Sequence, residues 1–174
     1  MRTFIPHTVL IGLLAAALPA EPVLAVDEIE ISFDRKRLDK QVSRDGDMTV
    51  TSQDIVYDIE LKNMTFDDMG PLVVKYMVFY EDKQPGKATD AVELWVTGEE
   101  KVEGIASRET AELTTKPVQL KKEQLDSGYY WTSGAKSRSR DRVIGVWCKV
   151  FDGEREVAEY IKPSSIARRH DWEE

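Results

Sequence analysis

The sequence predicts an all-β fold: a single antiparallel, immunoglobulin-like β-sandwich of about seven strands. Three observations support this prediction. Apolar residues alternate with polar ones at a period of two, as in half-buried strands. Turn signals separate these runs at roughly regular spacing, which is typical of sandwiches. No 12-residue stretch after position 25 carries an apolar stripe at helical spacing.

Each candidate strand has its own pattern. Residues 29–33, 55–61 and 92–96 alternate, whereas 72–80 is apolar on both faces and therefore predicted to be central. Residues 113–120 include Pro117, which cannot donate to a ladder and belongs at an edge or bulge. Residues 121–125 could form a helical turn, and 164–169 a short terminal one. The segments 35–47, 81–90 and 126–142 are predicted to be irregular.

The last two candidate strands, 143–151 and 154–161, flank Asp152-Gly153, a pair favoured in two-residue hairpin turns of type I′. With these two as the loop, Phe151 faces Glu154, Lys149 faces Glu156, Cys148 faces Val157 and Trp147 faces Ala158. Val146 then lies on the core face and Trp147 on the other, partly covered face. Glu159 falls on the same face as Val157 and Ile161, so a bulge intervenes or that end is exposed.

The first 25 residues match a secretory signal peptide. Arg2 precedes the uncharged apolar run 9–18. Val23-Leu24-Ala25, with Leu18-Pro19-Ala20 as a second option, offers the pattern at which a signal peptidase cleaves. The run is short for a membrane span, which needs about 20 apolar residues, although an uncleaved anchor remains the alternative. We therefore expect a signal peptide at 1–25 and a periplasmic or secreted domain at 26–174, with no membrane span after processing.

Net charge and cysteine content limit the partners and the covalent cross-links that this chain can have. The formal net charge of −8 argues against nucleic acid as the partner. The single cysteine, Cys148, excludes an internal disulfide and is expected to be a buried core residue, with a reactive thiol as the alternative.

Catalytic side chains are scarce. Only His7 and His170 exist; His7 lies in the signal peptide, and His170 is expected in an exposed tail. A Ser-His-Asp or Cys-His site would have to bring the terminal His170 to a nucleophile, and Cys148 with His170 falls far short of a zinc ligand set. We therefore expect no cofactor, no metal and no enzyme activity, although a glycosidase carboxylate pair stays open. Asn63-Met64-Thr65 matches the N-glycosylation pattern, which matters only in a eukaryotic host.

Two basic segments are the candidate binding surface. Residues 35–44 carry five bases against Asp39, and residues 136–142 carry four against Asp141. They could be separate solvated loops, or one patch that attracts an anionic partner if both lie at the same end of the sandwich. The aromatic triplet before the second segment could pack under a loop or anchor a partner or sugar. The tentative binding residues are Tyr129, Tyr130, Trp131, Lys136, Arg138, Arg140 and Arg142.

The last 45 or so residues show a resemblance. Tyr-Tyr-Trp-Thr-Ser-Gly from Tyr129, then Gly145-Val146-Trp147, Phe151-Asp152-Gly153 and Lys162-Pro163-Ser164-Ser165, resemble the closing part of small uncharacterised exported proteins of Gram-negative bacteria. The strand pattern more loosely resembles immunoglobulin-like and fibronectin-III-like modules, without the paired cysteines of true immunoglobulin domains. The resemblance implies an envelope location and transfers no activity or site residues.

Together these observations predict an exported, non-enzymatic sandwich that binds an envelope or extracellular protein or has a structural role. The alternative is a glycan-binding or glycan-cleaving module that uses the aromatic triplet and a basic loop.

Overall fold

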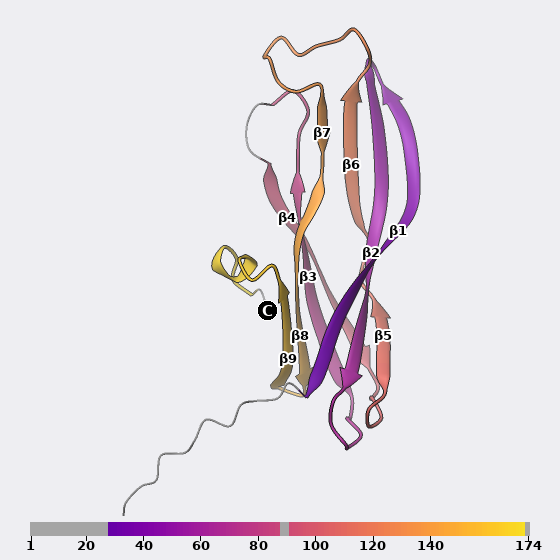
Figure 1. The fold of residues 1–174 in the computed structure, drawn as a ribbon, viewed down its shortest axis with the longest axis vertical. Coiled ribbons are helices and arrows are strands. Elements are labelled where there is room, and N and C mark those ends of the chain that lie inside the picture. The colour runs from indigo at the N-terminus through magenta and orange to yellow at the C-terminus, as the bar shows by residue number, and fades with distance from the viewer. Residues whose placement is uncertain (1–27, 88–90, 173–174) are drawn as a thin grey trace, which may run out of the picture.

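The structure is a computed structural model that describes residues 28–87 and 91–172. The predicted signal peptide and the two cleavage positions lie outside the described residues. Antiparallel strands form two packed sheets (Figure 1). The first sheet has the order β1-β2-β6-β7, with β5 also paired to β2, and the second has the order β4-β3-β8-β9. The strands are β1 (Ile29–Asp45), β2 (Met48–Asn63), β3 (Leu72–Asp82), β4 (Val92–Val102), β5 (Thr110–Thr114), β6 (Val118–Leu125), β7 (Arg138–Arg140), β8 (Arg142–Asp152) and β9 (Arg155–Lys162).

The predicted all-β sandwich is confirmed, and its seven expected strands account for most of the nine observed. β5 and β6 follow one path along β2 and are separated by three residues that end with Pro117. The short strand β7, in a segment predicted to be irregular, is separated from β8 only by Asp141, where the chain passes from the first sheet to the second. Residues 121–125 belong to β6, so the suggested helical turn there is wrong. A short 3-10 helix, η1 (Ile166–Arg168), does follow β9.

The main core lies between the two sheets. The inward-facing residues of β1, β2, β3, β6, β8 and β9 fill it, and Ile55, Ile59 and Val78 are fully buried there. A smaller cluster lies on the opposite face of the second sheet, where η1 and Trp172 cover Met77, Phe79 and Trp147. Val146 therefore faces the core and Trp147 the other, covered face, as the alternation predicts.

The register of the β8–β9 hairpin differs from the prediction. Asp152 pairs with Arg155, so Gly153-Glu154 is the two-residue turn, and only Gly153 has a positive φ, of 61°. A bulge at Val157 then shifts the ladder by one residue, so that Cys148 pairs with Tyr160. The correct alternative is the bulge, because it lets Val157 and Ala158 both be buried while Glu159 faces outward.

The segment from 35 to 45, predicted to be irregular, is instead the upper half of β1. It pairs with β2 up to a tight turn in which Asp45 faces Met48 across Gly46-Asp47. Every residue from Asp34 to Asp45 is exposed, so burial does not produce the alternation that would reveal the strand in the sequence. In Figure 1 this half of β1 rises beside β2 and β6 toward the loop that joins β6 to β7.

Candidate binding site: a basic trough

A β-bulge places the bases of β1 on one face of the first sheet. Up to Arg37, the odd-numbered residues of β1 share the core face with Ile31 and pair with inward-facing residues of β2. Leu38 and Asp39 form the bulge, after which Lys40 pairs with Gln53. Because directly paired residues share a face, the even-numbered residues then continue on the inner side. The inner face of β1 thus carries Arg35, Arg37, Lys40 and Arg44.

Bases from β6 and β7 complete the opposite wall. Thr51 of β2 pairs with Lys122 of β6, which in turn pairs with Arg140 of β7, so both bases share the inner face. The two sheets leave a groove of about 410 Å³ here, which we call the basic trough. It is lined by Arg35, Arg37, Lys40, Thr51, Gln53, Leu120, Lys121, Lys122, Arg140, Asp141, Arg142 and Val143. The two basic segments of the sequence therefore meet in one site.

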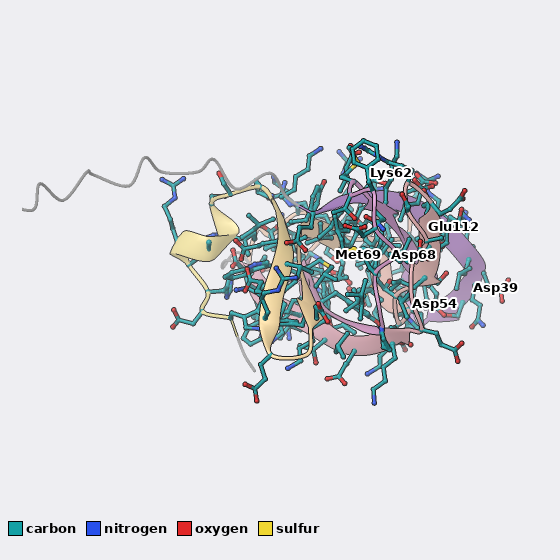
Figure 2. All side chains as sticks on the ribbon, turned by 90° about the horizontal axis from the view of Figure 1, so that it is seen from below. Asp39, Asp54, Lys62, Asp68, Met69 and Glu112 are labelled. Atoms are coloured by element: carbon teal, nitrogen blue, oxygen red, sulfur yellow. The ribbon has the colours of Figure 1, made fainter. Side chains whose placement is uncertain are left out.

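Few carboxylates offset these charges. Asp141 is buried, and its oxygens accept the backbone N–H groups of Lys83 and Lys121 at 2.9 and 2.8 Å, which ties the end of β3 to β6. Asp39, in the bulge, projects at the periphery of the molecule (Figure 2). Asp34 and Asp58 are directly paired positions on the outer face of the sheet. The trough thus carries bases on the inner face of β1, whereas Asp34 and Asp58 lie on the outer face of the same sheet.

The bases of the trough are available to a ligand. Among the described residues, the side chains of Arg37, Lys40, Lys122 and Arg140 make no hydrogen bond or ion pair. Arg and Lys offer donors and no acceptors, so such a set is suited to holding carboxylate, sulfate or phosphate oxygens. The floor, made by Thr51 and Gln53, is polar and uncharged.

Arg142 differs from the other bases because it is already paired. Its Nε and Nη2 donate to the two carboxylate oxygens of Glu81 at 2.8 and 2.9 Å. This bidentate contact lowers the pKa of Glu81 and raises the pKa of Arg142. Lys136 and Arg138 line a separate cavity of about 640 Å³ beside residues 83–87, where Glu81 and Glu93 balance part of the charge. Of the predicted basic residues, Arg140 is thus the main contributor to the trough.

The aromatic triplet does not form one platform. Trp131 is half-buried on the backbone of Gly86, where a Cβ on the glycine would lie 3.2 Å from the indole ring, and its Nε1 is buried with no hydrogen-bond partner among the described residues. Tyr129 is 53% exposed and hydrogen-bonded to Asp47, which raises the pKa of Tyr129. Tyr130 is 81% exposed. The rings of the two tyrosines, but not that of Trp131, are therefore exposed to a partner.

Other candidates have structural roles. The prediction that His170 is exposed is wrong: its ring packs on Phe79 with centroids 4.7 Å apart, and Nε2 lies 2.8 Å from Glu93 Oε2. Burial raises the pKa of Cys148 to about 12, in agreement with a core thiol. Within residues 28–87 and 91–172, no group of three His, Cys, Asp or Glu side chains is placed to hold a metal ion.

Lys122 is a trough residue that the sequence reasoning missed. It lies in the stretch for which a helical turn is suggested, yet Val118, Leu120 and Lys122 alternate with outward-facing residues along β6. That period of two was the available signal. The bases of 35–44 are evident in the sequence. That four of them share one face of the sheet is not evident, because it depends on the bulge at Leu38-Asp39.

No family model matches the chain, and no curated protein matches it. Three solved structures are similar to this chain at low sequence identity. The curli protein CsgC of E. coli has 13% identity and a TM-score of 0.34, over 78% of this chain and 98% of that one. A structural-genomics target, SoR45, has 11% identity and a TM-score of 0.38, over 84% and 96%. A protein from Akkermansia muciniphila has 10% identity and a TM-score of 0.30, over 80% of this chain and 73% of that one.

In the described part of the chain, no helix is long and apolar enough to cross a bilayer.

Proposed function

We propose that this chain is an exported, non-enzymatic β-sandwich that binds a polyanionic partner of the cell envelope or its surroundings in the basic trough. The observation that carries the proposal is the convergence of two basic segments, far apart in sequence, on one groove of about 410 Å³. A chain of net charge −8 that gathers unpaired bases on one face has a local field opposite to its overall charge. Such a field attracts and orients an anionic partner.

The glycan alternative has weaker support in its original form. It required Tyr129, Tyr130 and Trp131 as a stacking platform, whereas the Trp131 ring packs on Gly86. A sulfated glycan could still enter the trough through its charges alone.

Poly-L-glutamate is a suitable first probe, because it carries carboxylates without aromatic or sugar groups. The test compares the mature protein with the triple variant Arg35→Ser, Arg37→Ser, Lys40→Ser by titration calorimetry at low salt. Three lost contacts of the size of exposed ion pairs, roughly 0.2–1 kcal/mol each, predict binding that is weaker by about tenfold. The matched control, Lys62→Ser, Lys101→Ser, Arg168→Ser, removes the same charge from exposed sites elsewhere.

The proposal predicts that the control triple variant binds like the native protein, and that both triple variants keep the native melting temperature. Binding should weaken steeply with salt, because the screening length shortens from about 10 Å at 0.1 M to about 3 Å at 1 M. Equal loss of binding in the two triple variants would show that net charge, and not the trough, attracts the probe.

A further inference from the structure

We propose that the partner presents an extended acidic segment, which adds as a strand to the free edge of β1 and places alternate carboxylates over the trough. This inference rests on the proposed function, because it specifies the class of the anionic partner. Three features of β1 support it: its open edge, the spacing of its bases and the positive charge of its inner face.

The edge of β1 is open along its upper half. β1 is the terminal strand of the first sheet and forms a ladder only with β2 among the described strands. The second sheet approaches β1 at its lower end, where Phe33 stacks on Tyr160 with centroids 5.1 Å apart. Above this contact every residue from Asp34 to Asp45 is exposed. An edge strand presents a row of unpaired N–H and C=O groups, and an extended peptide can pair with such a row.

The bases of β1 repeat at the spacing of a strand. Alternate residues of a strand lie roughly 6.7 Å apart on one face. The inner-face positions of β1, in order, are Arg35, Arg37, Lys40, Val42 and Arg44, and they pair with five successive inner-face residues of β2, Tyr57, Ile55, Gln53, Thr51 and Thr49. An incoming strand with Asp or Glu at alternate positions would place carboxylates beside these positions, four of which are bases and the fifth Val42. Opposite charges across a strand pair stabilise the pairing.

The same features exclude other strands. Inward-pointing charges and a bulge, here at Leu38-Asp39, are devices by which edge strands avoid pairing with other chains. A strand with carboxylates on the inner face would neutralise these charges, whereas an uncharged strand would leave them without partners. A second copy of this protein is disfavoured too, because β1 against β1 would set bases opposite bases. Specificity thus arises from repulsion of the wrong strands as well as attraction of the acidic one.

The test uses two peptides of identical composition. One has glutamate at alternate positions with threonine between, and the other has all its glutamates in one block. Strand addition predicts that the alternating peptide binds the mature protein about tenfold more tightly and slows hydrogen exchange of amides between Asp34 and Asp45. Methylation of alternate peptide nitrogens on the edge that faces β1 should abolish binding, whereas methylation of the other edge should not.

A matched pair of variants tests whether the peptide contacts the inner face of β1. Arg37→Ser removes a base from the inner face, and Lys36→Ser removes the neighbouring base from the outer face, where it pairs with Asp58. The inference predicts weaker peptide binding for Arg37→Ser alone, with unchanged melting temperatures.

Each other outcome contradicts the inference in a distinct way. Equal affinity for the two peptides would overturn strand addition but leave a polyanion-binding trough. Binding of a sulfated glycan with neither peptide bound would make the partner a glycan. A stable dimer through β1 would make the partner a second copy, and no binding of any polyanion would overturn the proposed function itself.

Discussion

Asn63 shows how one buried side chain organises the lower end of the sandwich. It is fully buried at the end of β2, and its Nδ2 lies 2.8, 3.1 and 3.2 Å from the carbonyl oxygens of Asp67, Ile105 and Ala106. Its Oδ1 accepts hydrogen bonds from the backbone and hydroxyl of Thr65. The side-chain amide in the glycosylation pattern is therefore occupied by internal hydrogen bonds.

Replacing Asn63 should destabilise the protein strongly. Asn63→Ala leaves several buried polar groups without partners, at about 1–3 kcal/mol for each group left unsatisfied. Urea unfolding should show a loss of at least about 2 kcal/mol, whereas the exposed neighbour change Lys62→Ala stays within about 0.5 kcal/mol. Equal stability of the two variants would contradict the hydrogen-bond assignment.

Gly98 is required because the ring of Tyr76, on the neighbouring strand, lies against it. Tyr76 crosses over it to accept a hydrogen bond from the backbone N–H of Lys116 at 2.7 Å, and a Cβ on Gly98 would lie 2.2 Å from the Tyr76 hydroxyl oxygen. Gly98→Ala should displace the ring and cost about 1–3 kcal/mol. The matched change Thr97→Ala, at the neighbouring position of the same strand, should be nearly neutral in a thermal melt.

Cys148 provides a pH-dependent prediction. Burial raises the pKa of its thiol from its usual 9.0 to about 12, so the native state disfavours the thiolate. The contribution of this group to stability is intact below pH 9 and is lost as the pH rises toward 12. A thiol reagent at about pH 8, below the usual thiol pKa, should not react until urea unfolds the protein. Rapid reaction of the native protein would show that Cys148 is accessible.

The segment that carries η1 acts as a cover for the outer face of the second sheet. Ile166 is fully buried against Gly145, and the rings of Trp147 and Trp172 meet at 5.2 Å with an interplanar angle of 67°. Trp147 also donates to Glu159 through its Nε1 at 2.9 Å. Without this segment, Met77, Phe79 and Trp147 would form an exposed apolar patch.

Ile166→Ala should therefore cost about 2–5 kcal/mol, the usual range for truncating a buried isoleucine. Trp147 should also become more solvated, which fluorescence emission would report as a red shift. Arg168→Ala, in the same turn but exposed, is the control. An unchanged emission maximum for Ile166→Ala would show that the segment does not cover Trp147.

The alternation of apolar and polar residues predicts the strands that bury one face in the core, and it misses strands that are exposed on both faces. Residues 29–33, 55–61 and 72–80 are recognisable as strands because one or both faces are buried. The upper half of β1 is exposed on both faces, so no apolar period marks it. The bulges at Leu38-Asp39 and Val157 shift the register of their ladders, and nothing local in the sequence specifies them.

At the scale of the whole molecule, the first sheet gathers unpaired bases on its inner face, whereas on its outer face Lys36 is paired with Asp58. The inner face of β1 carries Arg37 and Lys40, while Asp34 and Asp58 lie outside. The sequence shows that two basic segments exist, but whether they share an end of the sandwich depends on topology. The switch of the chain at Asp141, held by the backbone N–H groups of Lys83 and Lys121, brings Arg140 opposite β1.

The central claim is that these two segments form one anion-binding trough, and backbone NMR tests it most directly. During a titration of the protein with poly-L-glutamate at low salt, amide shifts should concentrate on the upper half of β1, on β6 around Lys122 and on β7. These shifts should reverse at about 1 M salt, where screening is nearly complete. Shifts confined to other basic positions such as Lys62, Lys101 and Arg168, or scattered over all basic residues alike, would contradict it.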